Sequence, residues 1–493
     1  MTRPTTDPTA GPDTQRLAEL DQQYVWHPFT PMQQWRQEPP MIIERGEGPY
    51  LFDTDGHRYI DGVSSLWCNV HGHRNPAIDA AVREQLDKIA HTTLLGLASP
   101  PSIELARQLA ERTPGDLCRT FYSDAGATAV ELAFKMAVGY WHHKGQPQRN
   151  RFIGLAGCYH GDTTGAMSVG YSDLFHRPFA AMVFPTHFAP CPDPVRLPPE
   201  VGTWLKERGF TLCSRCQGSG ECGLEVWPSE CITVTEALRQ HCLKGMRTML
   251  ETHGDEVAAI VVEPIMQGAA GMICQPEGFL KGVEDLAREF GVLLIADEVA
   301  TGFGRTGRMF ACEHDQVTPD IMCLAKGISA GYLPLAATIC TQEVESAFCG
   351  PLDAKRTLYH GHTYTGNPLA CAAAIASLEQ FDETDLLNHI QQSAKLITDK
   401  LQPLRDSPHV LDIRQRGLMT GIEICKDRSQ REPFDFSKRT AFELCLKMRP
   451  KGLIIRPLGD VMILMPIPNM PHDVLEQMLD IVVETTLQWP LPS

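Results

Sequence analysis

Two charged residues stand at the ends of short apolar runs in the second half of the chain. Asp297 closes the run 292–296, and Lys326 follows the run 321–325. Runs of this length are typical of buried strands, so each strand is expected to deliver one charged group at its end. A lysine amine can hold an aldehyde as a Schiff base, and a carboxylate can keep a pyridine nitrogen protonated. The pair therefore indicates an enzyme that uses pyridoxal phosphate (PLP).

An aspartate that caps a helix and a lysine at the surface would give the same two residues without any chemistry. The segment between them favours the catalytic interpretation. It contains Gly302, Gly304 and Gly307, and glycines suit a loop that passes close to a ligand.

A candidate phosphate site lies earlier in the chain. Residues 123–128, Ser-Asp-Ala-Gly-Ala-Thr, follow a predicted strand and begin a predicted helix. The free N–H groups and positive dipole end of a helix N-terminus attract an anion, and Gly126 lets the backbone approach it. An ordinary capped strand-turn-helix has the same pattern. The ligand site is favoured because this loop would share the sheet edge with the charged pair.

These residues require a scaffold of mostly parallel strands. From about Ser102 onward, short apolar runs alternate with helical patterns, which predicts an α/β fold whose sheet is covered by helices. The expected strands are 119–123, 151–155, 258–263, 292–297, 321–325 and 335–341. After about Leu378, long amphipathic stretches bracket two segments, 410–424 and 453–466, and predict a smaller α+β lobe.

The expected domain organisation follows from these patterns. Residues 1–16 are predicted to be a flexible tail, and 17–75 an N-terminal segment that packs with the small domain. The large PLP-binding domain is expected at 76–375 and the small domain at 376–493. Residues 193–231 look like an insertion in the large domain.

Composition excludes several classes of protein. The chain has 493 residues, of which 43% are hydrophobic and 21% charged, as in globular proteins with two or three lobes. A net charge of −16 argues against a nucleic-acid or anionic-membrane partner, because phosphate groups would be repelled. No apolar stretch approaches the roughly 20 residues that span a bilayer, and residues 1–14 lack a hydrophobic signal region. We therefore expect a cytoplasmic protein.

The 17 cysteines are an odd number scattered through apolar runs, so reduced thiols are expected. Four of them, Cys213, Cys216, Cys222 and Cys231, fall in the insertion and could form a closed structural zinc site. A cysteine-rich loop without metal is the alternative, since the last two do not form a second C-x-x-C pair. No metal ligand is predicted at the PLP site.

Longer motifs resemble a known family. The segment from Leu294 to Lys326 resembles the signature of class III (ornithine-type) aminotransferases, which have PLP fold type I. Five further blocks resemble the branch that makes 7,8-diaminopelargonate (DAPA) for biotin synthesis, and they lie at 26–30, 64–73, 159–163, 360–367 and 456–460. The resemblance covers the chain from about residue 20 to 485.

The resemblance implies a role for each residue that matches a cofactor contact. Lys326 would hold the cofactor and move a proton, and Asp297 would pair with the pyridine nitrogen. Tyr159 would stack on the pyridine ring and border the substrate. Gly126 and Ala127 would present backbone N–H groups to the phosphate.

The resemblance also implies a homodimer with shared active sites. His362 and Thr363 would reach the phosphate of the other subunit's cofactor. Arg456 would bind the substrate carboxylate through its planar guanidinium, while Gly361 and Trp67 would lie beside the substrate.

The implied reaction transfers an amino group to 7-keto-8-aminopelargonate (KAPA). S-adenosylmethionine (SAM) is the expected donor because most of this branch uses it. Phe29, Leu66 and Ala127 stand where a tyrosine, a tryptophan and a serine are usual. Loss of a phenol and an indole makes lysine the alternative donor, since its long stem needs less aromatic surface. The alternative activity is that of an ω-amino acid aminotransferase of the same class or of a decarboxylase of the same fold. A binding protein that kept the fold without PLP is disfavoured, because Lys326 is present.

Overall fold

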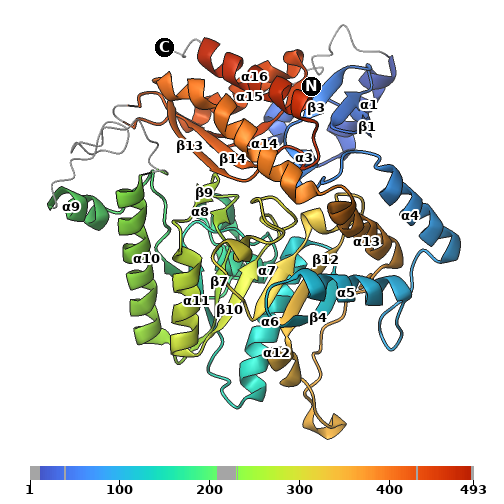
Figure 1. The fold of residues 1–493 in the computed structure, drawn as a ribbon, viewed down its shortest axis with the longest axis vertical. Helices are drawn as coiled ribbons and strands as arrows, with labels where there is room; N and C mark the ends of the chain where they lie inside the picture. Colours follow the sequence, from blue (N-terminus) through green and yellow to red (C-terminus); the bar gives the residue numbers. More distant parts are fainter. Residues whose placement is uncertain (1–11, 38–39, 208–228, 230, 429–430, 490–493) are drawn as a thin grey trace.

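The computed structural model describes residues 12–37, 40–207, 229, 231–428 and 431–489 (Figure 1). Its centre is a seven-stranded sheet with the order β4-β12-β11-β10-β7-β5-β6. The strands are β4 (Leu117–Ser123), β5 (Arg151–Leu155), β6 (His187–Ala189), β7 (Val257–Val262), β10 (Leu293–Asp297), β11 (Ile321–Leu324) and β12 (Ala336–Thr341). The six strands predicted from the sequence are confirmed to within two residues at either end. The three-residue strand β6 was not predicted.

Strand direction places all functional loops at one edge. β12 is antiparallel to both of its neighbours, whereas the other neighbouring pairs are parallel. β12 alone is therefore reversed, and the other six strands share one direction. Their carboxyl ends meet at the same edge, which is where ligands bind in open α/β sheets.

Helices cover both faces of this sheet because its strands are apolar on both sides. Leu294 and Ala296 of β10 belong to a core cluster with one set of helices, while Leu293 and Ile295 pack with α6 (Gly126–His143) on the other face. This alternation is the period of two expected of a strand. The helices of the first set are α4 (Pro76–Lys88), α5 (Pro100–Arg112), α10 (Ile232–His253), α11 (Phe279–Phe290) and α13 (Pro368–Glu383).

Two smaller sheets are formed by the chain ends. One contains β1 (Ile43–Glu47), β2 (Tyr50–Asp53), β3 (Arg58–Asp61) and β15 (Leu453–Ile454). Because β15 pairs with β3, the N-terminal segment shares a sheet with the C-terminal part of the chain. The other contains β13 (Val410–Arg416), β14 (Met419–Ile424), β16 (Arg456–Leu458) and β17 (Val461–Leu464). Helices α14 (Leu386–Lys400), α15 (Thr440–Met448) and α16 (His472–Gln488) lie with it at the top of Figure 1.

The shorter elements connect these layers. They are helices α2 (Met32–Trp35), α3 (Ser64–Trp67), α7 (Thr164–Val169), α8 (Asp173–His176), α9 (Pro199–Glu207) and α12 (Gln342–Ser346), and strands β8 (Met266–Gln267) and β9 (Ile273–Cys274). None of the described helices is long and apolar enough to cross a membrane.

The first described helix begins before the N-terminal boundary expected from the sequence. Helix α1 (Pro12–Tyr24) begins inside the segment predicted to be a flexible tail, and Thr14 is buried where its hydroxyl donates to Asp55 at 2.8 Å. The polar composition of residues 12–16 suggested a free chain, but this contact with the turn after β2 fixes them. Of the candidate zinc ligands, Cys213, Cys216 and Cys222 lie outside the described residues, and Cys231 directly precedes α10.

Candidate active site

A cavity of about 660 Å³ lies at the carboxyl edge of the sheet and is lined by residues from five strand ends. Residues 124–127 follow β4, 159–163 follow β5, and Glu263 follows β7. Asp297 is the last residue of β10, and Lys326 comes two residues after β11. The volume is within the roughly 300–1,000 Å³ that is usual for small-molecule sites.

Lys326 lines this cavity with a buried amine. Its Nζ lies 4.9 Å from the centre of the Trp67 ring, and its backbone is in the left-handed region with a φ of 46°. Burial lowers the pKa of Lys326, although the nearby Asp297 and Glu263 carboxylates oppose this effect. A lowered pKa leaves more of the amine in the neutral form that attacks a carbonyl.

Asp297 is held in place by a buried histidine. Its Oδ2 lies 2.7 Å from Nδ1 of His160, and its Oδ1 accepts the backbone N–H of Val299 at 3.0 Å. His160 is 3% exposed, and its Nε2 has no hydrogen-bond partner among the described residues. His160 lies in the 159–163 motif, but its role could not be predicted from the sequence, because its contact with Asp297 joins positions 137 residues apart.

The phosphate end of the cavity is formed by the start of α6. Its N-cap residue is Ala125, which offers no side-chain acceptor, so the first N–H groups of the helix stay available to an anion. A Cβ at Gly126 would lie 2.7 Å from Val299 Cγ1, and one at Gly161 would overlap the Ala127 side chain. The glycines therefore permit a close backbone approach. Within the described residues, the buried Thr163 hydroxyl also has no partner.

Tyr159 also lines the cavity. Its hydroxyl donates to Asp162 at 2.7 Å, and its backbone N–H donates to Glu263 at 3.1 Å. The hydroxyl contact restrains the ring and the backbone contact fixes the residue that carries it, so a ligand would meet an aromatic surface of limited mobility.

Glu263 is a buried acid that the sequence analysis missed. It is 4% exposed and accepts the N–H groups of Tyr159 and Gly268. Burial raises the pKa of Glu263 to about 7, with a further contribution from Asp297 that His160 opposes. Glu263 directly follows the apolar strand β7, and a charged residue at a strand end is the pattern that identified Asp297, so the same pattern could have identified Glu263.

Trp67 reaches the cavity wall from a strained turn. All four residues Ser64–Trp67 have positive φ values between 48° and 77°, which costs roughly 1–2 kcal/mol per residue for side chains other than glycine. Asp61 holds the turn by accepting the N–H and hydroxyl of Ser65, and the buried Arg305 donates to Ser64 Oγ. Trp67 Nε1 is buried without a partner among the described residues. Strain and an unpaired donor together indicate a functional position.

Gly361, His362, Thr363 and Arg456 are not among the described residues that line the cavity. His362 nevertheless lies next to it, because its Nε2 is 3.1 Å from Asp124 Oδ1 of the same chain. Asp124 belongs to the loop at the phosphate end.

Arg456 lies on the sheet face that is directed toward Trp67. It pairs with Ile463 across β16 and β17, and directly opposed residues share a face. Ile463 packs in the same cluster as Trp67. Among the described residues the exposed Arg456 guanidinium has no hydrogen bond or ion pair, so it is available to a carboxylate.

Comparison with known proteins assigns the family. The model of the family "Aminotransferase class-III" matches residues 32–485. The chain belongs to the class III aminotransferases. A curated relative, the adenosylmethionine-8-amino-7-oxononanoate aminotransferase of Geobacter sulfurreducens, is 45% identical over 96% of each chain.

Solved structures agree with this assignment. The enzyme of the same name from Methanocaldococcus jannaschii superposes with a TM-score of 0.85 at 40% identity, covering 97% of this chain and 99% of that one. An amine transaminase from an uncultivated Pseudomonas species, solved in a PLP-bound form, gives 0.83 at 32% identity, covering 94% of this chain and 98% of that one. The α/β fold expected from the sequence is confirmed by these class III neighbours.

Proposed function

We propose that this class III aminotransferase uses PLP to convert KAPA to DAPA in biotin synthesis. The observation that carries the proposal is the near full-length similarity to curated enzymes named for 8-amino-7-oxononanoate, which is KAPA. The cavity supports it, because it combines a nucleophilic amine, a fixed carboxylate and free backbone N–H groups. We place the enzyme in the cytoplasm.

The site residues fit PLP, and each has a distinct task in the proposal. Bound PLP supplies an electron sink for the carbon that loses a proton. Lys326 would hold the cofactor aldehyde and would move the proton at the substrate carbon, while Asp297 would keep the pyridine nitrogen protonated. Tyr159 would support the ring, and the N–H groups of Gly126 and Ala127 would bind the phosphate.

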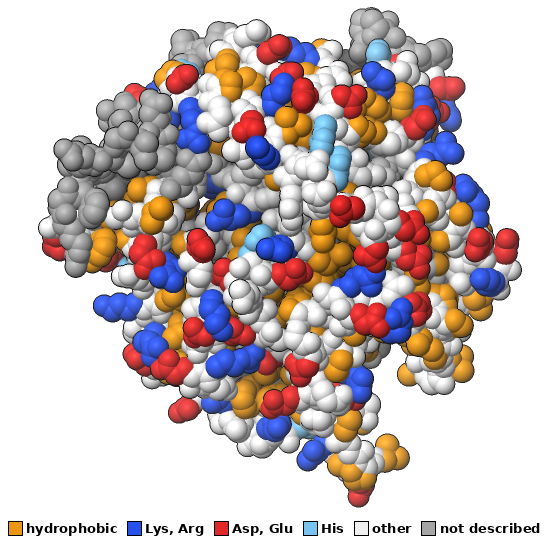
Figure 2. Space-filling model, in the orientation of Figure 1, with side chains coloured by type: hydrophobic (Ala, Val, Ile, Leu, Met, Phe, Trp, Pro, Cys, Tyr) orange, Lys and Arg blue, Asp and Glu red, His pale blue; other side chains and the backbone are white. Residues whose placement is uncertain are grey.

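The proposal includes a homodimer whose second copy covers an apolar surface near the cavity. Exposed hydrophobic side chains occur at Leu86, Ile89, Leu95, Leu97 and Ile103, and Figure 2 shows such side chains over the connection between α4 and α5, at the lower right. Tyr364 is 59% exposed and adjoins this surface, since its ring lies 5.0 Å from that of His91. Burial of this surface by a second copy would place Thr363 at the dimer interface, where the proposal assigns it and His362 to the partner's phosphate.

Arg456→Lys is expected to raise the KM for KAPA at least tenfold and to leave PLP affinity unchanged. An ammonium cannot reproduce the planar two-point contact of a guanidinium with a carboxylate. Steady-state kinetics and a PLP titration check this, with Arg247→Lys on α10 as the control. An unchanged KM would mean that the KAPA carboxylate is bound elsewhere.

The donor is assigned to SAM, with lysine as the alternative. Phe29 and Leu66 are 60% and 53% exposed, and neither is among the described residues that line the cavity. Trp67 and Tyr159 do line it, and they can provide the aromatic contacts that the SAM sulfonium and adenine favour. The phenol missing at Phe29 and the indole missing at Leu66 are therefore changes outside the cavity lining.

We expect SAM alone to convert bound PLP from its aldehyde to its amine form, and Phe29→Tyr to preserve or improve that rate. Stopped-flow absorbance with each amine separately measures this half-reaction. If lysine converted bound PLP to its amine form rapidly and SAM did not, the donor would be lysine, and the assignment of KAPA as the acceptor would still stand.

A further inference from the structure

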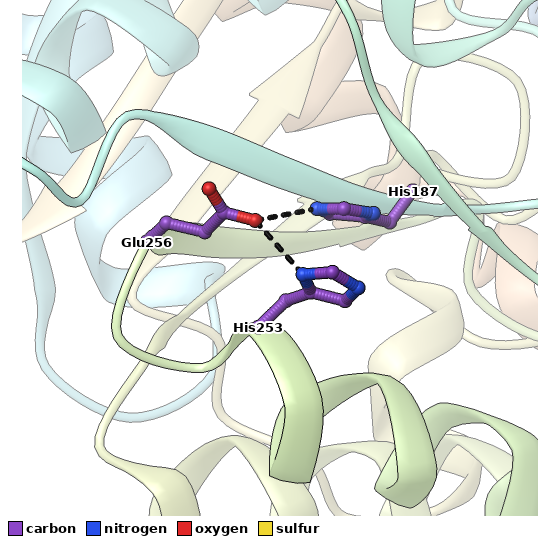
Figure 3. A group of neighbouring side chains, drawn as sticks. All are labelled: His187, His253 and Glu256. Carbon is purple, nitrogen blue, oxygen red and sulfur yellow. Dashed lines mark hydrogen bonds and ion pairs between the residues drawn. The ribbon is translucent and has the colours of Figure 1, made fainter.

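Three metal-ligating side chains meet at the sheet edge opposite the cavity (Figure 3). His187 is the first residue of β6, and Glu256 directly precedes β7. His253 is the last residue of α10. Since β6 and β7 run in the same direction as β10, these positions lie at the amino ends of the strands. The group is therefore separate from the PLP site.

The ligand atoms of the three residues already have nearly the spacing of a metal site. Oε1 of Glu256 lies 3.2 Å from Nε2 of His187 and 3.0 Å from Nδ1 of His253, and all three ligand atoms lie within 4.8 Å of one another. Metal bonds of about 2.0–2.2 Å in a tetrahedral site put neighbouring ligand atoms roughly 3.3 Å apart. The three ligand atoms are therefore close enough together to share one ion.

The backbone holds these three residues in position without a ligand. His187 pairs with Ile153 in the sheet, and the Glu256 carbonyl accepts the N–H groups of Asn150 and Arg151. The Glu256 N–H donates to the His253 carbonyl at 2.9 Å, which fixes the end of α10 beside β7. Ligands carried on such rigid elements lose little entropy on binding an ion.

The two imidazole rings are stacked with their centres 4.2 Å apart at an interplanar angle of 23°. All three residues are only partly buried, so an ion can enter and a water can occupy a remaining position. Two imidazoles and one carboxylate suit zinc and the neighbouring transition metals better than magnesium or calcium.

We propose that His187, His253 and Glu256 bind one divalent transition-metal ion, such as Zn²⁺, with water completing the coordination. The ion links the edge strand β6 to the end of α10 and to the start of β7. Its role is structural, because the PLP chemistry takes place at the other edge of the sheet. The site does not depend on the proposed reaction, and the sequence analysis missed it because His187 and Glu256 are 69 positions apart.

The test counts zinc bound to full-length, PLP-loaded protein. Cys213→Ser, Cys216→Ser, Cys222→Ser and Cys231→Ser are introduced first, so that the four candidate thiols of the insertion do not contribute. After equilibrium dialysis against micromolar Zn²⁺, the parent is expected to retain one more zinc per chain than either His187→Ala or His253→Ala. Cobalt should give visible absorption bands in the parent that both variants lack.

Two further variants separate metal binding from loss of folding. Glu256→Gln keeps the shape of the side chain and should weaken zinc binding at least tenfold. His389→Ala is the matched control, because His389 stacks on His472 at 4.4 Å in a pair outside the proposed site. It should retain all the zinc of the parent. Two outcomes would overturn the proposal. One is that the parent binds no zinc, and the other is that the zinc content is the same in the parent and in His187→Ala, His253→Ala and Glu256→Gln.

Discussion

Lys326→Ala is expected to bind PLP noncovalently and to lose transamination by at least about a thousandfold. The variant has no amine to hold the cofactor aldehyde, and no base at the position from which a proton can be moved. The lowered pKa of Lys326, caused by burial, suits this nucleophilic role. Single-turnover kinetics measure the loss. PLP binding is followed separately by absorbance.

The covalent attachment of the cofactor can be located directly. Borohydride reduction of the wild-type protein should fix PLP on the peptide that contains Lys326, as read by mass spectrometry. Lys400→Ala, which removes a half-buried lysine of α14 paired with Asp480, is the control and should remain fully active. Labelling of another lysine in the wild-type protein would overturn the assignment.

Asp297→Asn is expected to bind PLP and to lose transamination by roughly a hundredfold or more, the usual scale for removing a preorganised electrostatic group. An amide cannot keep the pyridine nitrogen protonated, so the cofactor becomes a poor electron sink. The contact with His160 Nδ1 also changes, because it now meets an uncharged amide.

The matched control is Asp382→Asn, an exposed aspartate paired with Arg112. It should have normal kinetics. Near-normal transamination by Asp297→Asn would exclude Asp297 from this role, whereas loss of PLP binding alone would point to a structural role.

The strand positions and the charged strand ends could be predicted from the sequence because both are local signals. An apolar run of five residues followed by Asp297 or Lys326 identifies a strand and its functional end together. The reversal of β12 could not be predicted, because β12 is as buried as the parallel strands of the same sheet.

Other features of the site depend on contacts between distant parts of the chain. The left-handed turn that presents Trp67 depends on the buried Arg305, 241 residues from Ser64. The orientation of Asp297 depends on His160 in the same way. The face on which Arg456 lies follows from its pairing with Ile463, and no local pattern specifies that register.

The most direct test of the account is to incubate the purified, PLP-loaded protein with KAPA and SAM and to identify the product by mass spectrometry. The account predicts that DAPA accumulates, and that Lys326→Ala forms none. In a parallel reaction, lysine replaces SAM, and in another an ω-amine with pyruvate tests the alternative activity. The account would be contradicted if the ω-amine aminated pyruvate while neither SAM nor lysine, as donor, gave DAPA from KAPA.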